Sequence, residues 1–587
     1  MTKQHVSRRA FLAGSAASMA LGSLAGVAHA ATKPQEQWDE VFDVIVIGSG
    51  LAGMCAALAA KKNGCKKVVV LEKMSYLGGN SAIATGDFGA VNSQLTRKQG
   101  IKDTPEAFAE DISAACGGLN HPDLTLTVAR NSGRAIDFLI ENGAKFNPEI
   151  IILGGHSAPR VHQGVESFGA SVMVPIWDSF RKKYNGEIRS RVKFDSFIQD
   201  ESGAVTGVNV RERYDFINES KNEDMENAGG LPKRYAARYG VVLATGGYSR
   251  DLAFRMAEAP LQSEEMATRC HIGNTAGALR AALAIGARSV HTTLGRYGFY
   301  IASEDLRMGM VIDPKTCKRF IDESMPRTDL AVNMLLYMQK HRCIPLGIYD
   351  KKTMDAFFDH KRRQRLLFSN ALRPYDTLEE LAAKEHLDLK TLKATLDRYN
   401  KDIAAGRDSE FGKDIAGSLS VPLTEPPFAA CTIEPDLSYT QGGVLINTRA
   451  EAISALDDKP IPGLYVAGEA SAGVFGVTRL TACSLPDCAA FGMIAGEEIA
   501  KGPATSRPSY GGIHEDTHVE HDRRRPFAGK LCRLGRELCE PQKHAPGPGL
   551  RGLPPGRSGP HAAAQRSLPE LPWSHAGSHQ ENGRVQA

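Results

Sequence analysis

The sequence has few features that would bind a metal ion or a haem. Its eleven cysteines are scattered, and no two of them have the C-x-x-C spacing, which disfavours zinc, thioredoxin-like and iron–sulfur sites. No C-x-x-C-H occurs either, so the chain has no attachment site for a c-type haem. We therefore expect neither a metal site nor a haem in this chain.

The chain also lacks a strong charge of one sign. A net charge of +4 is small for 587 residues, and no basic stripe with interleaved aromatic residues is present, so we expect no nucleic-acid partner. A hydrophobic content of 42% is ordinary for a soluble protein. The length allows two or more domains with large cores.

The first thirty residues have the features of an export signal. A twin-arginine pattern at Ser7–Leu12 is followed by a weakly apolar stretch and by Ala28-His29-Ala30, an A-x-A cleavage site. A membrane anchor is the alternative, but the stretch is short, is rich in small residues and ends in a cleavage signal. We therefore predict that residues 1–30 are removed, that the twin-arginine route exports the protein to the periplasm, and that no membrane span remains.

The stretch that follows predicts a dinucleotide-binding unit. An apolar strand, Phe42–Ile47, ends in the G-x-G-x-x-G of residues 48–53, a helix covers 51–62, and a second strand ends at Glu72. In this pattern Gly48 allows the tight turn, Gly50 lets the backbone approach a pyrophosphate, and Gly53 lets helix and strand pack closely. The helix N-terminus attracts the phosphates and Glu72 accepts a ribose hydroxyl hydrogen bond. The alternative is a glycine-rich turn in an unrelated α/β unit.

Further segments point to FAD and to one discontinuous domain. A second glycine pair, Gly78-Gly79, follows the acidic residue, and no other strand leads into a G-x-G-x-x-G helix, so no separate NADH site is evident. Strands that end near Gly246-Gly247 and Gly468-Glu469 are expected to return to the same sheet, and strands near 188–198 and 205–211 form an inserted meander.

The predicted fold class is α/β, with a Rossmann-like FAD-binding domain interrupted by an α+β capping domain. The FAD-binding domain takes residues 38–290 and 437–502, and the capping domain takes 291–436. The stretch 503–587 is dense in Pro, Gly, Arg and His without a hydrophobic period, and is interpreted as disordered or non-native in sequence. A basic partner-binding tail is the alternative.

From Phe42 to Gly496 these segments resemble, in order, the soluble fumarate reductase/flavocytochrome c flavoproteins, relatives of the succinate dehydrogenase flavoprotein subunit. The resemblance implies non-covalent FAD and no haem domain. It implies cofactor contacts from Gly48, Gly50, Leu51, Ala52, Gly53, Glu72, Lys73, Gly79, Asn80, Ser81, Thr245, Gly246, Gly247, Glu469, Ser484 and Leu485.

The resemblance also implies a reaction, in which a hydride passes from flavin N5 to one alkene carbon of fumarate and an arginine protonates the other. The segment KRFIDESMPR places the proton donor at Arg327, and Ser303-Glu304-Asp305-Leu306-Arg307 matches the relay that supplies it with protons, through Glu304 and Arg307. These three are the predicted catalytic residues.

The substrate carboxylates are assigned by the same resemblance. His291 and Ser303 would hold one carboxylate and Arg479 the other. Two arginines and a histidine in one cleft bind carboxylates well, and their positive field makes the alkene more electrophilic. Tyr439 occupies the place of a second family histidine, so the expected substrates widen to other α,β-unsaturated carboxylates, including aryl acrylates.

The predicted function is a periplasmic FAD-dependent reductase of fumarate or a related enoate in anaerobic respiration. Its electrons would come from a separate redox partner, expected to be a c-type cytochrome. Two alternatives stay open: an FAD-dependent dehydrogenase that runs oxidatively, of the ketosteroid or succinate type, and a non-catalytic flavin electron carrier.

Overall fold

The computed structural model describes residues 38–218, 222–301, 303–357, 360–415 and 420–502, without the side chains of Ser303, Glu304 and residues 360–362. The predicted signal at 1–30 and the predicted tail at 503–587 therefore lie outside the described residues.

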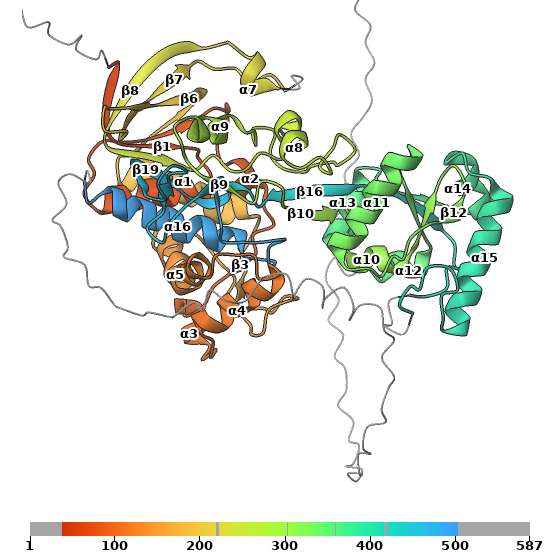
Figure 1. Ribbon diagram of the computed structural model, residues 1–587. Coiled ribbons are helices and arrows are strands. Elements are labelled where there is room, and N and C mark those ends of the chain that lie inside the picture. The colour runs from red at the N-terminus through yellow and green to blue at the C-terminus, as the bar shows by residue number, and fades with distance from the viewer. Residues whose placement is uncertain (1–37, 219–221, 302, 358–359, 416–419, 503–587) are drawn as a thin grey trace, which may run out of the picture. The chain divides into compact units, whose positions relative to one another are not determined.

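An eight-stranded sheet organises the dinucleotide-binding part (Figure 1). Strands β1, β2, β5, β8 and β19 run parallel, and β18 pairs antiparallel with β19 at one edge. Three segments that are far apart in the sequence thus form adjacent strands, as the sequence predicts. In order across the sheet the strands are β18 (Glu451–Ile453), β19 (Pro460–Val466), β8 (Leu231–Leu243), β1 (Glu40–Ile47), β2 (Val68–Glu72) and β5 (Glu187–Ser190).

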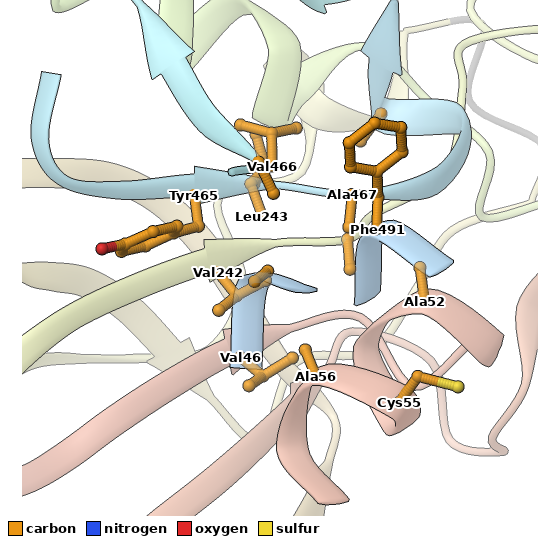
Figure 2. Packing of buried hydrophobic residues seen from close by; sticks show 14 of the residues in the cluster. Val46, Ala52, Cys55, Ala56, Val242, Leu243, Tyr465, Val466, Ala467 and Phe491 are labelled. Atoms are coloured by element: carbon orange, nitrogen blue, oxygen red, sulfur yellow. The ribbon is translucent and has the colours of Figure 1, made fainter. Parts of the chain in front are cut away.

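Two helices from opposite ends of the described chain cover one another beside this sheet. Helix α1 (Leu51–Lys62) is almost wholly buried and packs against α16 (Ser484–Ile499). A Cβ at Gly492 would lie 2.4 Å from the Ala52 carbonyl oxygen, so only glycine permits this approach. Figure 2 shows Val46, Val242 and Val466 from three parallel strands beside Ala52, Ala56 and Phe491 of the two helices.

The inserted meander is present, but the predicted strand near 188–198 is divided at Arg191, which has φ +58°, and its first part is β5 of the parallel sheet. Strands β6 (Val192–Gln199) and β7 (Val205–Glu212) pair antiparallel with each other, and β7 pairs with the first half of β8. The other elements of this part are α2 (Gly79–Ile83), β3 (Phe88–Gly89), α3 (Gln94–Lys98), α4 (Pro105–Ala115), α5 (Pro122–Glu141), β4 (Val161–His162), η1 (Gly169–Met173), α6 (Val174–Asp178), η2 (Ser179–Lys183), α7 (Glu223–Glu226), α8 (Leu252–Glu258), α9 (Gly277–Ala284), β9 (Ser289–Val290), β17 (Gly443–Leu445), η3 (Gly468–Ala470) and β20 (Ser471–Ala472).

A second, five-stranded antiparallel sheet lies within the segment assigned to the capping domain, whose exact bounds stay a prediction. Its strands, in order, are β12 (Lys318–Arg319), β11 (Met310–Asp313), β13 (Leu346–Tyr349), β15 (Phe428–Thr432) and β14 (Leu372–Tyr375). The helices of this segment are α10 (Ser303–Met308), α11 (Arg327–His341), α12 (Lys351–Asp355), α13 (His360–Phe368), α14 (Leu378–Lys384) and α15 (Leu389–Ala405).

A buried ion cluster fixes the loop that leads into α11. The Arg319 guanidinium donates to Glu323 at 2.8 Å and to Asp408 at 2.9 Å, and all three side chains are nearly inaccessible to solvent. Because breaking one partner of such a cluster leaves a buried charge uncompensated, the loop is held in one arrangement. The cluster thereby fixes where α11 begins, at Arg327.

A two-stranded ribbon, β10 (Gly295–Phe299) and β16 (Pro435–Thr440), joins the two sequence segments that flank the five-stranded sheet. In its antiparallel register Arg296 lies opposite Tyr439, and paired residues of this kind project to the same face. Among the described helices, none is both long and apolar enough to cross a bilayer.

Candidate active site

A cavity of about 1570 Å³ opens along the carboxyl ends of β1, β2 and β8, the edge where parallel α/β sheets bind their ligands. All the residues predicted to bind the cofactor line this cavity except Gly53 and Gly247. The prediction that they form one site is therefore consistent with the structure, although their individual contacts stay predictions.

The glycine loop has the geometry that the motif requires. Gly48 has φ +106°, and a Cβ there would lie 2.3 Å from the Ala244 carbonyl oxygen, so the turn excludes other residues. A Cβ at Gly53 would lie 2.0 Å from the Gly48 carbonyl oxygen, which explains why Gly53 packs inside and does not line the cavity. Helix α1 begins without a side-chain cap from Gly50; its first amide, Leu51, donates to the Ser81 hydroxyl at 3.0 Å, and the positive end of the helix still faces the cavity, where it attracts an anion.

Glu72 is held by the loop itself. Its carboxylate accepts hydrogen bonds from the Ser49 hydroxyl at 2.6 Å and from the Met74 amide at 3.0 Å. The Ser49 hydroxyl in turn accepts from the Gly78 amide at 2.9 Å. Glu72 therefore ties the first glycine loop to the second, and the ribose contact stays a prediction.

A second network joins the 78–81 loop to the end of β19. Asn80 donates to Glu469 at 3.3 Å and accepts from the His271 amide at 2.7 Å. Glu469 also accepts from the amide and hydroxyl of Thr440, and burial raises the pKa of its carboxyl. A Cβ at Gly247 would lie 1.9 Å from the Thr440 hydroxyl oxygen, so Gly247 serves this packing and not the cavity wall.

The remaining lining residues fit FAD. Asn274 lines the cavity, and its buried amide nitrogen and oxygen have no hydrogen-bond partner among the described residues, as expected of a group that binds a polar ligand. Lys73 donates to the Thr275 hydroxyl and lies 3.6 Å from Asp224. A glycine turn, a helix N-terminus and unsatisfied polar groups together suit a dinucleotide with a polar chain.

Predicted substrate residues share the same cavity. Tyr439, Arg479 and Arg327 all line it. The Arg479 guanidinium carbon lies 5.1 Å from the Tyr439 ring centroid, a cation–π distance. Arg479 donates to the Leu480 carbonyl at 3.2 Å, while its Nε has no partner among the described residues, so the guanidinium retains capacity for a carboxylate.

The predicted residues Ser303, Glu304 and Arg307 are not seen in the cavity wall. The side chains of Ser303 and Glu304 lie outside the described residues. Arg307 does not line the cavity, and its guanidinium donates to the Ser324 carbonyl at 2.6 Å, three residues before Arg327. This contact connects α10 to the loop that precedes α11.

His291 also does not line the cavity, so the structure does not bring it together with Arg479 and Tyr439. Its backbone has φ +60°, and its ring lies 6.0 Å from that of His121. Burial and the neighbouring His121 lower the pKa of the His291 imidazole. The role of His291 at a substrate carboxylate therefore stays a prediction.

Two functional candidates were missed by the sequence reasoning. Arg296 lines the cavity, and burial together with the charges of Arg479 and Arg327 lowers the pKa of its guanidinium. Asp487, in the first turn of α16, is 2% exposed and lies close to Tyr439. The signal for Arg296 was the alternation of the strand Gly295–Phe299, in which Tyr297 and Phe299 are the buried neighbours.

Comparisons with known proteins agree with this geometry. Residues 43–485 match a family model described as an FAD binding domain. The chain is 33% identical over 513 residues to an acrylate reductase flavoprotein subunit of Shewanella woodyi, which covers 84% of this chain and 98% of that protein. It is 29% identical over 477 residues to a fumarate reductase (cytochrome) of Shewanella frigidimarina, covering 79% of this chain and 77% of that protein.

The fold comparison gives the same result. The chain is similar to a solved structure described as the open conformation of a flavocytochrome c3 fumarate reductase, with a TM-score of 0.70, 27% identity and 79% of each chain covered. The predicted fold class and the predicted FAD cofactor are confirmed.

Proposed function

We propose, from the premise that this chain belongs to the FAD binding domain family and is an FAD-dependent oxidoreductase, that it reduces the carbon–carbon double bond of small α,β-unsaturated carboxylates. One observation carries the proposal: Arg296, Arg327 and Arg479 line the same cavity as the dinucleotide loop. Guanidinium groups are suited to carboxylates, and a positive field beside an alkene stabilises the charge that develops during its reduction.

The chain's own residues have distinct roles in this reaction. When bound, FAD supplies a hydride to one alkene carbon. Arg479, stacked on Tyr439, binds and orients the substrate carboxylate. Arg327 holds a proton on a guanidinium nitrogen and gives it to the other alkene carbon, so that one hydride and one proton complete the reduction.

Proton supply is the next step of the proposal. Arginine ordinarily stays protonated, with a pKa above about 12, so a donor of this type must be re-protonated after each turnover. Glu304 and Arg307 are the proposed relay. The contact of Arg307 with Ser324 supports it, because it keeps α10 beside the loop that ends at Arg327.

For the substrate, we propose acrylate-type carboxylates ahead of fumarate. Tyr439 is buried, and burial together with the Asp487 carboxyl raises the pKa of its hydroxyl well above the usual range. A neutral tyrosine beside Asp487 offers the substrate an aromatic face in place of a second cation. The name of the Shewanella woodyi relative, an acrylate reductase, supports this choice.

We further propose a periplasmic, respiratory role with a separate electron donor, expected to be a c-type cytochrome. The support is the twin-arginine pattern at Ser7–Leu12 and the A-x-A site at Ala28–Ala30. The related protein of Shewanella woodyi is described as a flavoprotein subunit, which agrees with a separate partner.

Anaerobic oxidation of reduced methyl viologen tests the activity, with acrylate, methacrylate, cinnamate, urocanate and fumarate as acceptors. We expect turnover with acrylates, and turnover that exceeds that with fumarate. Turnover with none of the five carboxylates would contradict the proposed function. Faster turnover with fumarate than with every acrylate would contradict the role given to Tyr439.

The same assay tests the proton donor. Arg327→Ala should retain FAD and lose turnover by a factor of about 10³ or more, since general acid catalysis typically contributes 10²–10⁴-fold. Arg342→Ala is the matched control, because Arg342 follows the other end of α11 and pairs with Glu265 at the surface. Near-normal turnover of R327A with full flavin content would exclude Arg327 as the donor.

A further inference from the structure

Arg296 has the environment of a ligand-binding cation. Its side chain makes one hydrogen bond within the described residues, from Nη1 to the Ser438 hydroxyl at 3.2 Å, although a guanidinium has five N–H donors. Arg479 and Arg327 are close enough to lower the pKa of Arg296 further, and of the surrounding groups Asp436 acts in the opposite direction. Asp436 itself pairs with Arg269.

This arrangement costs free energy in the absence of a ligand. Arg296 is half-buried; a partly desolvated charge without a well-placed anion is unfavourable, and like charges nearby add to the cost. An anion in the cavity would relieve both effects. The structure therefore retains at Arg296 a charge that a bound anion stabilises.

The position of Arg296 determines which part of the substrate it meets. In the β10–β16 ladder Arg296 lies opposite Tyr439, and the guanidinium of Arg479 stacks on the Tyr439 ring. Arg296 and Arg479 thus approach the same aromatic side chain from β10 and from the segment after β20. Two guanidinium groups beside one ring can share a single carboxylate.

Two further arginines of the lining are placed differently: Arg269 pairs with Asp436, and Arg365 is an exposed residue of α13. His291 faces His121 and does not line the cavity. Next to Arg296 along the chain the lining includes Phe299 and Ile301, which are apolar and buried, together with Tyr300, over whose ring the paired Arg269 lies. A substrate with one carboxylate and an apolar remainder matches this distribution of charge.

We propose that Arg296 is a substrate-binding and specificity-determining residue that, together with Arg479, clamps the single carboxylate of unsaturated monocarboxylic acids. The choice of unsaturated acids rests on the proposed function, whereas the carboxylate clamp is tested without turnover. In this arrangement Arg327 does not bind the carboxylate and serves as the proton donor to the alkene carbon.

The test uses the oxidised, FAD-loaded full chain and sodium propionate, a saturated monocarboxylate that cannot be reduced at a double bond. Binding is followed by the change in flavin absorbance. Arg296→Gln should weaken propionate binding by about 10- to 100-fold, the range for loss of a hydrogen bond to a charged group. Arg296→Lys should recover most of this loss, and the surface variant Arg288→Gln, which removes the same charge from an ion pair with Asp458, should bind within twofold of the parent.

Thermal stability separates a binding role from a structural one. If Arg296 is held for a ligand, R296Q should melt at the same temperature as the parent or higher without propionate, and propionate should no longer raise its melting temperature. A structural role predicts a lower melting temperature and loss of flavin, and that outcome would overturn the proposal. Ser438→Ala, which removes only the hydroxyl that holds Arg296, should weaken propionate about threefold to tenfold while FAD is retained.

The remaining outcomes are also decisive. Unchanged propionate affinity in both R296Q and S438A would overturn the clamp, and succinate binding at least tenfold more tightly than propionate would overturn the preference for one carboxylate. In turnover, R296Q should raise KM for acrylate while kcat stays within about threefold. If the parent enzyme reduces no enoate, the proposed function fails, but the propionate titration still decides the role of Arg296.

Discussion

At the scale of single residues, Asp487 is an acid in an unusual place. It lies in the first turn of α16, is 2% exposed, and has one carboxyl oxygen without a partner among the described residues. Burial raises the pKa of this carboxyl from 3.8 to about 7, although the nearby Arg479 acts against the shift. In the folded protein the protonated form is therefore favoured below about pH 7.

This shift gives stability a distinct dependence on pH. The folded pKa lies above the unfolded value, so the stabilisation associated with the protonated form is complete below about pH 4 and is lost as the pH rises through about 7. Asp487→Asn, which keeps the size and shape of the side chain but cannot ionise, should remove this dependence. Its stability relative to the parent should increase by on the order of 3 kcal/mol between pH 4 and pH 8.

Denaturant unfolding at several pH values, with saturating FAD, measures the difference. Asp355→Asn is a useful control, because Lys351 lowers the pKa of the exposed Asp355 carboxyl. The stability of D355N relative to the parent should therefore change little with pH, and should decrease as the pH rises. A difference between D487N and the parent that is constant from pH 4 to pH 8 would show that Asp487 does not titrate in this way.

At the scale of elements, the contact of α1 with α16 depends on two glycines one turn apart. A Cβ at Gly496 would lie 2.2 Å from the Ala56 carbonyl oxygen, and a Cβ at Gly492 would lie 2.4 Å from that of Ala52. Since these neighbours are backbone atoms of a buried helix, they have little freedom to move away.

Gly496→Ala should therefore force the helices apart and destabilise the protein by about 3 kcal/mol, with a lower melting temperature and weaker retention of FAD. The matched control is Gly154→Ala, where an added Cβ meets no atom within 4 Å. Equal melting temperatures for the two variants would mean that the helix pair adjusts easily, contrary to this expectation.

Local signals explain which elements the sequence predicts well. The predicted helix 51–62 coincides with α1 because an apolar strand, a glycine turn and a run of good helix formers mark both of its ends. The meander and the returning strands were equally clear, since each is a hydrophobic run bounded by glycines or polar turns. The resemblance supplied their order in one sheet, which periodicity alone does not give.

The site was predicted only where residue type and chain order determine position. The glycine loops, Tyr439 and Arg479 depend on such local patterns. The positions of Arg296 and Asp487 in the site follow from tertiary structure. A strand register places Arg296 opposite Tyr439, and the packing of α16 brings Asp487 close to that tyrosine. His291 was assigned by order; its backbone has φ +60° and its side chain does not line the cavity, and its contact with the substrate stays a prediction.

At the scale of the whole molecule, charge is distributed unevenly. The net charge of the chain is only +4, yet Arg296, Arg327 and Arg479 face one cavity. Attraction of an anionic substrate should therefore come from the cavity and should be screened by salt, since the Debye length falls from about 30 Å at 0.01 M to roughly 3 Å at 1 M.

We expect kcat/KM for acrylate to fall several-fold as ionic strength rises from about 0.01 to 0.5 M, while kcat at saturating acrylate stays nearly constant. If screening is the cause, steady-state assays in two salts with different anions should give the same dependence of kcat/KM on ionic strength. A kcat/KM that does not change with ionic strength would argue that these arginines act only at contact distance.

The interleaving of distant segments in one sheet has a consequence for biosynthesis. Strand β19 and helix α16 complete the sheet and the cavity wall that β1 and α1 begin, and Ser484 and Leu485 line the cavity. During translation, at ~15 residues per second, roughly half a minute separates the emergence of α1 from that of α16. Throughout that interval the buried face of α1 has no partner helix, so the nascent chain depends on chaperones or on interim contacts, and flavin insertion must follow synthesis of the last helix.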